Sequence, residues 1–297
     1  MDLLQLKYFL AVAKHGNITH AANELYIAQP SLSRTIANLE EELGHKLFDR
    51  KGKRIYLNEN GEIFAKRIRR IFSDIDMAKH ELDDLSGRKQ RRLIIGSTIA
   101  RLMPKLLSGF LSEHGSVQFN LIQVTNHDSI KNRLLNGEID LSISILPVEN
   151  DGCECVRLAY DPLVLIIPES HRLAGEDKIS IASLAEEPLV YHSGETGLRV
   201  ICDSFFEEIG VTPYIAFECT TPDVICELVR CGFGYALIPS SWLETVNTAG
   251  LCVHNVSDAV CGRHFWIGWL KDRYMSAAVR EFIRYSSEYF ARIEESL

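Results

Sequence analysis

Small hydroxyl side chains gather at three points where an expected strand runs into an expected helix. They are Ser97-Thr98, Ser193 and Thr196 in the segment 193–197, and Thr220-Thr221. Hydroxyl groups and the free N–H groups of a helix N-terminus together suit a carboxylate or another anion. Ordinary helix capping is the simpler interpretation of any one junction. In α/β sheets, ligands bind beyond the carboxyl ends of the strands, where such junctions lie.

A second group of residues has the chemistry to meet nucleic acid. Residues 46–54 hold five Lys and Arg residues against Asp49 alone. The net charge of the chain is −8, yet residues 1–92 carry 17 basic and 13 acidic residues, whereas residues 93–297 carry 15 and 27. A basic head on an acidic body indicates two modules with different partners. A net charge of −12 on the body disfavours a polyanionic ligand, so one or two negative groups are expected.

Catalytic signatures are missing from the sequence. It contains no G-x-S-x-G, phosphate-binding loop, H-E-x-x-H or dinucleotide fingerprint. Gly232-Phe233-Gly234 precedes a strand, which is the wrong context for phosphate. His192 and Ser193 are adjacent on a strand and would point to opposite faces. An enzyme is therefore the less favoured alternative, and neither a cofactor nor a metal is expected.

Eight cysteines lie in the second part of the chain, without a C-x-x-C pair or a zinc-ligand spacing. The N-terminus lacks the pattern of a secretory signal, and no apolar stretch is long enough to span a bilayer. The thiols are thus expected to be reduced and mostly buried, in a cytoplasmic protein. Redox sensing stays open as an alternative, although the Cys153/Cys155 and Cys226/Cys231 spacings suit disulfides poorly.

The elements that must position these residues begin with three short helices. Apolar residues repeat at helical spacing from Leu6 and from Ile18, Gly16 ends the first helix, and Asn17 is a good N-cap for the second. After a turn at 26–28, Gln29-Pro30 opens a third helix that Gly44 ends. This pattern predicts a helix-turn-helix, with a plain three-helix bundle as the alternative.

The third helix has the polarity of a recognition helix. Opposite its apolar face it carries Pro30, Ser33, Arg34 and Asn38, while Glu40, Glu41 and Glu42 cluster at its far end and should point away from phosphate. Residues 47–50 and 54–57, with Gly52 between them, predict a basic two-stranded hairpin, or wing.

About the first 60 residues resemble the N-terminal domain of LysR-type transcriptional regulators without a gap. The resemblance rests on Asp2-Leu3-Leu4-Gln5-Leu6-Lys7-Tyr8-Phe9, Asn17-Ile18-Thr19-His20-Ala21-Ala22, Gln29-Pro30-Ser31-Leu32-Ser33-Arg34, Leu39-Glu40-Glu41-Glu42-Leu43-Gly44 and Leu47-Phe48-Asp49-Arg50. Asn58 stands where the family usually has Thr, and Asn caps a helix equally well. Together with the polar face of the third helix and the basic wing, the resemblance implies a set of DNA-contacting residues. They are Asn17, Thr19, Gln29, Pro30, Ser31, Ser33, Arg34, Asn38, Arg50, Lys51, Lys53 and Arg54.

A long helix is expected after Asn58. Apolar residues are spaced 4, 3, 4, 3, 4 and 3 apart at Phe64, Ile68, Ile71, Ile75, Ala78, Leu82 and Leu85. This is the pattern of a two-helix coiled coil, so the helix is expected to form a homodimer. The alternative, a helix packed on its own domain, would need a broader apolar face. Residues 86–92 form a polar, basic hinge.

From Leu93 on, strand-like runs alternate with helical segments, which predicts an α/β fold with mostly parallel sheets. Three stretches look like the effector domain of the same family: Leu93-Ile94-Ile95-Gly96, Gly137-Glu138-Ile139-Asp140-Leu141 and Gly232-Phe233-Gly234-Tyr235-Ala236-Leu237-Ile238-Pro239. Such a domain resembles type II periplasmic binding proteins, with two lobes joined by two crossing strands. By analogy the chain crosses near residues 159–163 and returns near 267–270.

The expected division is a winged helix-turn-helix domain at 1–58, a linker helix and hinge at 59–90, and an effector-binding domain at 91–297. Lobe I would comprise about 91–161 and 268–297, and lobe II about 162–267. In a ligand-sensing family the three hydroxyl junctions favour a site between the lobes, for which we expect Ser97, Thr98, Ile99, His127, Ser193, Thr196, Thr220 and Phe233. Glu195 would repel an anion unless it points outwards.

The expected function is a DNA-binding transcriptional regulator controlled by a small, anionic effector. Its expected partners are double-stranded DNA with a two-fold symmetric operator, the effector, and a second copy of the chain. The resemblance also implies a homotetramer, and no membrane is expected. The peroxide-sensing branch of the family uses a Cys in the loop before the second-lobe helix, and residues 194–199 contain none.

Overall fold

Capping groups encoded in the sequence set the ends of the first helices. The computed structural model describes residues 1–52, 54–85, 92–115, 117–124, 126–149, 152–194, 196–258 and 261–296, and in it α1 runs Leu3–His15, α2 Ile18–Glu24 and α3 Gln29–Leu43. Gly16 and Gly44 adopt φ of 57° and 69° directly after α1 and α3. Asn17 Oδ1 accepts from the N–H groups of Thr19 (2.8 Å) and His20 (3.1 Å) and so caps α2. The predicted helix boundaries are confirmed.

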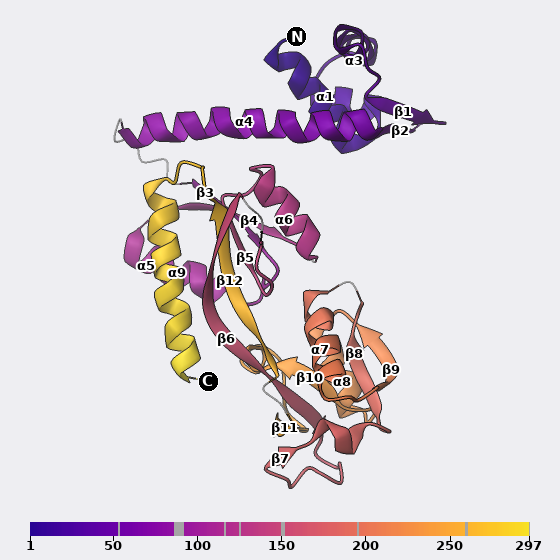
Figure 1. Cartoon of the computed structure of the whole chain (residues 1–297), viewed down its shortest axis with the longest axis vertical. Coiled ribbons are helices and arrows are strands. Elements are labelled where there is room, and N and C mark those ends of the chain that lie inside the picture. The colour runs from indigo at the N-terminus through magenta and orange to yellow at the C-terminus, as the bar shows by residue number, and fades with distance from the viewer. Residues whose placement is uncertain are drawn as a thin grey trace. The chain divides into compact units, whose positions relative to one another are not determined.

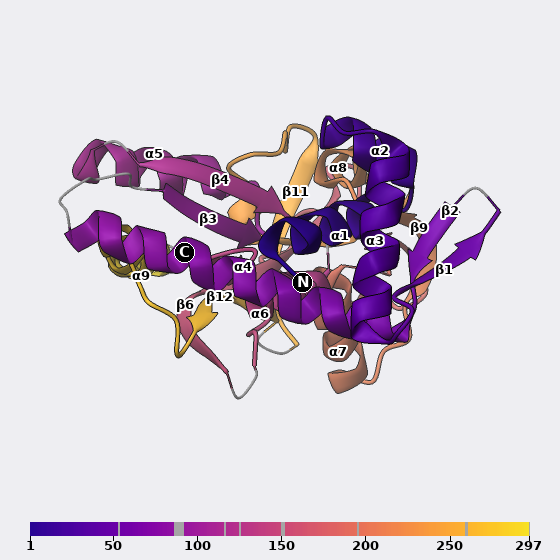
Figure 2. The same ribbon diagram turned by 90° about the horizontal axis from the view of Figure 1, so that it is seen from above.

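The chain divides into two compact units, an N-terminal one that ends at Gly87 and a C-terminal one that makes up most of the rest. In the N-terminal unit, β1 (Phe48–Lys51) and β2 (Arg54–Leu57) pair antiparallel, as the basic segment predicts. Figure 2 shows this hairpin projecting beyond the helices. Three predicted features, Lys53, the hinge at residues 86–91 and Glu195, lie outside the described residues.

The core of the N-terminal unit comes from the predicted apolar stripes of α1, α2 and α3. Phe9, Ala21, Leu32 and Leu39 are fully buried there. Small Ala21 lets α2 lie close to its neighbours, because a larger side chain at a buried crossing would separate the helices.

The long helix α4 (Glu59–Leu85) divides its apolar stripe between two uses. Asn58 Oδ1 accepts from the N–H of Gly61 (3.0 Å) near its start. Ile68 is 2% exposed in the core of its own unit, and the Phe64 ring lies 5.2 Å from that of Phe9. Ile68 is therefore taken up by packing within its own unit, and Phe64 is partly so, which leaves the later positions of the stripe for the expected seam. Towards the C-terminus, Leu82 is 65% exposed.

One lobe of the C-terminal unit is built around parallel strands. β3 (Arg92–Ser97) lies between β4 (Gln118–Gln123) and β5 (Leu141–Ser144) and is parallel to both. The helices of this lobe are α5 (Met103–His114), α6 (His127–Leu135) and the C-terminal α9 (Ala277–Ser296). They begin and end within three residues of the helical segments that the sequence indicates at 102–113, 129–136 and 276–293.

Two long antiparallel strands run from this lobe into the other, β6 (Cys153–Pro168) and β12 (Gly262–Leu270) (Figure 1). The first half of β6 pairs with β12 up to Pro162, and the second half pairs with other strands from Leu163 on, so the predicted first crossing is confirmed. The predicted return near 267–270 is too late, because Gly262 already pairs with Pro162, and Ile267 lies opposite Ile143 of the first lobe.

The second lobe contains β8 (Pro188–His192) parallel to β9 (Tyr214–Cys219), with α7 (Gly197–Glu208) and α8 (Pro222–Arg230). β10 (Ala236–Pro239) and β11 (Leu251–Val256) pair antiparallel with β6, and the short β7 (Lys178–Ile179) is parallel to β11. Single 3₁₀ turns lie at Ile181–Leu184 and Ser240–Trp242. The expectation of mostly parallel sheets is wrong, since the crossing strands give the large sheet an antiparallel centre. In the part of the chain described, no helix is long and apolar enough to cross a bilayer.

Candidate functional site

The outward face of α3 carries the predicted DNA-contacting side chains. Gln29, Pro30, Ser31, Arg34 and Asn38 are exposed, and Ser33 is half-buried. Ala28 at the N-cap supplies no side-chain hydrogen bond, so the first turn of α3 presents backbone N–H groups that could meet a phosphate. On α2, Thr19 is exposed, whereas the side chain of Asn17 is occupied by capping.

Glu40 fixes α3 to the wing, a role that the sequence interpretation missed. The side chain is 9% exposed, and Oε1 accepts from the backbone N–H groups of Leu47 (2.9 Å) and Phe48 (3.3 Å). Oε2 accepts from Lys46 Nζ (2.8 Å). The expectation that all three glutamates point away is thus wrong for Glu40, which is drawn inwards by unpaired N–H groups at the start of β1.

The wing presents Arg50, Lys51 and Arg54 to solvent on either side of the turn at Gly52, which has φ of 64°. A hollow of about 360 Å³ lies between α3 and the wing, with Ser33, Ala37 and Arg50 among its lining residues. The two predicted DNA-contacting elements therefore border one surface.

A cavity of about 280 Å³ lies between the lobes of the C-terminal unit. Four predicted effector contacts line it: Thr98, Ser193, Thr196 and Thr220. The rest of the lining was not predicted and consists of Gln123, Val124, Ile145, His192, Gly197, Leu198, Trp242 and Arg263. The structure thus brings together all three hydroxyl junctions, which are far apart in the sequence.

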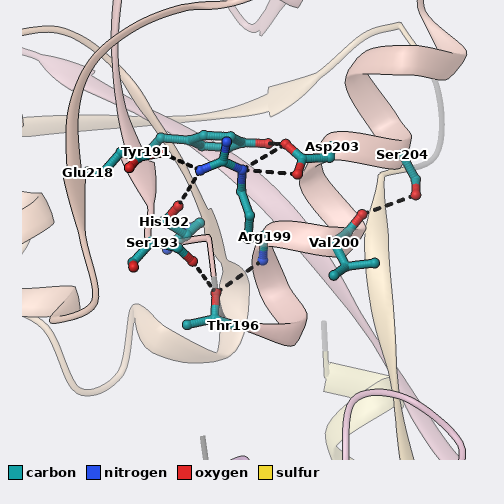
Figure 3. Close-up of polar contacts among 9 residues, drawn as sticks. All are labelled: Tyr191, His192, Ser193, Thr196, Arg199, Val200, Asp203, Ser204 and Glu218. Atoms are coloured by element: carbon teal, nitrogen blue, oxygen red, sulfur yellow. Dashed lines mark hydrogen bonds and ion pairs between the residues drawn. The ribbon is translucent and has the colours of Figure 1, made fainter. Parts of the chain in front are cut away.

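The hydroxyl groups in the cavity differ in their hydrogen bonds. Thr196 Oγ1 accepts from the N–H of Arg199 (3.2 Å) and donates to the carbonyl of Ser193 (3.1 Å), so it caps α7 (Figure 3). Thr98 Oγ1 is buried and has no hydrogen-bond partner among the described residues. A buried hydroxyl without a partner is costly, so Thr98 is the better placed of the two to bond a ligand.

Four other predicted effector residues do not line this cavity. Ser97 is fully buried, and its Oγ accepts a hydrogen bond from the N–H of Ile99 (3.1 Å). The side chain of Ile99 belongs to the hydrophobic core. Phe233 is 48% exposed and its ring packs 5.2 Å from that of Phe217. His127 begins α6, and burial lowers its pKa. At Ser97 the strand alternation explains the difference, because neighbouring side chains point to opposite faces.

Arg263 and Asp161 form a buried ion pair beside the cavity that sequence reasoning did not find. Arg263 Nε lies 2.8 Å from Asp161 Oδ2, and the two side chains are 5% and 0% exposed. Burial lowers the pKa of the Arg263 guanidinium, and the Asp161 carboxylate opposes that shift. No local sequence motif could predict this pair, because its two residues are separated by 102 positions.

His192 lines the same cavity as a neutral ring. Burial lowers its pKa to about 4, although a hydrogen bond to the carbonyl of Leu237 (2.8 Å) opposes that shift. The ring meets Trp242 edge to face at 5.6 Å. These two rings give one side of the cavity an uncharged aromatic surface.

The described lining of the cavity contains no cysteine. Among the described residues, no group of three or more His, Cys, Asp or Glu could hold a metal ion. All eight cysteines are free thiols, and burial raises the pKa of Cys202 and Cys226. Four of the eight are buried, three are half-buried and Cys231 is exposed, so the expectation of mostly buried thiols holds for only half of them. The buried, protonated thiols are the slow ones to react.

Comparison with known proteins agrees with this architecture. Residues 3–62 match the lysR family of bacterial regulatory helix-turn-helix proteins, and residues 86–291 match the LysR substrate binding domain. The chain is 32% identical over 289 residues to a RuBisCO operon transcriptional regulator of Allochromatium vinosum, with 95% of each chain covered.

Two further comparisons cover nearly the whole chain. The uncharacterized HTH-type transcriptional regulator YybE of Bacillus subtilis (strain 168) is 30% identical over 295 residues, which cover 98% of this chain and all of YybE. The structure of full-length CbnR complexed with its target DNA has a TM-score of 0.71 and 23% identity, covering 97% of this chain and 99% of that chain. The chain belongs to the LysR family of DNA-binding transcriptional regulators, which are not enzymes.

Proposed function

We propose that this LysR-type regulator binds a two-fold symmetric operator as a dimer and responds to a small anionic effector in the cavity between its lobes. The observation that carries the proposal is the cavity itself, lined from both lobes and containing the unpartnered hydroxyl of Thr98. A ligand that touches both lobes can bind two lobe arrangements with different affinity, which is the requirement for changing DNA affinity.

The DNA contacts of the proposal lie on α3 and on the wing. Arg34 and Asn38 would reach base edges from the exposed face of α3, and Arg50, Lys51 and Arg54 would contact phosphate. One α3 per subunit implies half-sites about one helical turn, roughly 10 bp, apart or a multiple of that. The CbnR complex with its target DNA, which shares the fold, supports this assignment.

The dimer would form through the second half of the α4 stripe. Ile71, Leu82 and Leu85 are 43%, 65% and 80% exposed on one helix face, with Ile75 and Ala78 between them in the same register. Apolar residues at this spacing form a seam when a second helix packs against them.

A homotetramer would need a second interface, and the C-terminal unit offers two exposed sheet edges. β4 and β9 are edge strands that expose apolar side chains, including Leu121 (37%), Tyr214 (60%) and Phe217 (37%). Edge strands with exposed apolar residues are prone to pair with another chain.

The proposed division into domains is 1–58, 59–90 and 91–297, in a protein of the cytoplasm. Lobe II begins at about residue 162, and the pairing of Gly262 with Pro162 supports an end near residue 262.

Ligand response tests the cavity. Full-length protein is screened against a metabolite library by thermal shift, and each hit is titrated while operator binding is followed by fluorescence anisotropy. Thr98→Val should weaken the response at least tenfold and leave operator binding without ligand unchanged. Thr212→Val, at an exposed threonine outside the cavity lining, is the control. An unchanged response of Thr98→Val would place the site elsewhere.

Operator binding tests the N-terminal unit in the same assay. Arg34→Ala should cost about 1–3 kcal/mol if the guanidinium contacts a base. Lys7→Ala on α1, outside the proposed contacts, should bind like the wild-type protein. Equal affinity of the two variants would rule out α3 as the reading helix.

A further inference from the structure

The Asp161 carboxylate is fully committed to its neighbours. Besides Arg263 Nε, it accepts from Ser240 Oγ (3.0 Å), from the backbone N–H of Ser241 (3.0 Å) and from Ser241 Oγ (2.8 Å). Four hydrogen bonds fill the accepting capacity of a carboxylate and hold its charge in place. The Asp161 carboxylate is therefore a fixed anion against which the Arg263 guanidinium is positioned.

Arg263 has donors beyond those that this pair uses. A guanidinium carries five N–H groups, and the polar partners described for Arg263 are Asp161 at Nε and Ser241 Oγ at Nη2 (3.4 Å). Arg263 also lines the cavity between the lobes. A planar fork at a cavity wall is the group that best matches a carboxylate, because it can donate two parallel hydrogen bonds.

Arg263 is the single charged side chain in the lining of this cavity, as far as the chain is described. His192 is neutral at physiological pH because burial lowers its pKa to about 4. The carboxylate of a ligand with one negative charge would share this cation with Asp161, whereas a second negative group would find no cationic partner in the lining. Burying an unpaired charge is strongly unfavourable.

The rest of the cavity lining is largely apolar, which favours a ligand with an apolar body. Val124 and Ile145 come from one lobe, and Leu198 and Trp242 come from the other. At about 280 Å³ the cavity is at the small end for ligand sites. Thr98 Oγ1 adds one unpartnered polar group to these apolar walls.

We propose that the effector is a compact monocarboxylate with an apolar body, an inference that rests on the proposed function. Its carboxylate binds Arg263 and accepts a hydrogen bond from Thr98. The site then selects ligands that carry one negative charge. The uncharged amide of the same acid would lack the ion pair with Arg263. A dicarboxylate or a phosphate ester would carry a second negative charge that has no cationic partner in the lining.

A matched ligand series on the wild-type full-length protein tests the charge rule. The probes are hexanoate, hexanamide and adipate, which share a chain length and carry one, no and two charges, together with phenylacetate and phenylacetamide. Binding is measured by calorimetry at pH 7.5. At least one monocarboxylate should bind tenfold more tightly than its amide, and hexanoate should bind tenfold more tightly than adipate. Failure of both monocarboxylates to bind, or a preference for adipate, overturns the proposal.

Paired variants test the role of Arg263. Arg263→Gln with Asp161→Asn removes both buried charges at once and avoids leaving one unpaired. This double variant should reduce the preference for carboxylate over amide from tenfold to threefold or less. Arg172→Gln, in the same lobe but exposed, should retain the full preference. A preference retained by the folded double variant overturns the assignment to Arg263. If the double variant does not fold, the wild-type series decides the proposal.

The outcomes also separate this proposal from the proposed function. If a dianion or neutral compound binds and Thr98→Val weakens it, the cavity is the effector site and the monocarboxylate assignment is wrong. If no compound in the series or the metabolite library changes operator affinity, the effector function fails as well.

Discussion

Arg199 Nη1 donates a hydrogen bond to the carbonyl oxygen of His192 (3.0 Å), which ties the first turn of α7 to the end of β8. The same guanidinium lies 4.2 Å above the Tyr191 ring and bonds Asp203 (2.8 Å) and Glu218 (2.6 Å), as Figure 3 shows. The residues between β8 and α7 include Ser193 and Thr196 of the cavity wall. Arg199 therefore holds that wall in shape without lining the cavity.

Arg199→Gln should lower the free energy of unfolding by about 1–2 kcal/mol, a modest figure because Asp203 and Glu218 are half exposed. Urea denaturation measures the change. The control is Arg172→Gln, where the pair between exposed Arg172 and half-buried Glu187 should be worth about 0.5 kcal/mol. Equal stability of the two variants would mean that the network contributes little.

Glu40→Ala should destabilise the N-terminal unit by about 2–4 kcal/mol, because it leaves the buried N–H groups of Leu47 and Phe48 without an acceptor. Operator binding should weaken with it, since the wing loses its attachment to α3. Glu40→Gln keeps an oxygen acceptor and should recover most of the loss. Exposed Glu41→Ala should change stability by less than about 0.5 kcal/mol. Thermal unfolding and fluorescence anisotropy provide the two measurements.

Leu82→Asp should break the proposed dimer, because each subunit would place a carboxylate in an apolar seam. The dimer dissociation constant should rise at least tenfold, about 1.4 kcal/mol or more. Sedimentation velocity measures it, and Glu81→Asp on the neighbouring face is the control. Retention of the wild-type mass by Leu82→Asp would show that the exposed half of the stripe has another use.

His192 should make the protein less stable in mild acid. Its pKa is about 4 in the folded state against 6.5 as the ordinary value, so below pH 6.5 the unfolded chain binds more protons. Its contribution is fully present above pH 6.5 and is lost as the pH falls towards 4. Between pH 7.5 and 5 the loss amounts to about 2 kcal/mol.

Urea denaturation of the wild-type protein and of His192→Gln at both pH values isolates this contribution. The difference between the two proteins removes the effect of His127 and His264, whose pKa values are also lowered. A pH dependence that is the same in both proteins would contradict the assignment.

Local features were predictable from the sequence because they depend on short-range physics. Gly16 and Gly44 end helices, Asn17 begins one, and apolar periodicity shows which faces of α1 to α3 are buried. The apolar pattern of the sequence indicates a strand at 163–167 only, whereas β6 begins ten residues earlier, at Cys153. Exposed Glu154 and the ring of Pro162 interrupt the apolar pattern there, and its pairing with β12 comes from far along the chain.

By itself the sequence determined the helix-turn-helix, the wing, the long helix and the hydroxyl junctions, because caps, turns and periodicity act over a few residues. Tertiary structure alone decided what those parts do together. In the folded chain the Glu40 carboxylate bonds the start of the wing, and Ile68 lies in the core of the N-terminal unit while Leu82 remains exposed. It also brought Arg263 to Asp161 at the crossing of two strands. Such pairings depend on the register and burial of segments far apart in the chain, which no local pattern records.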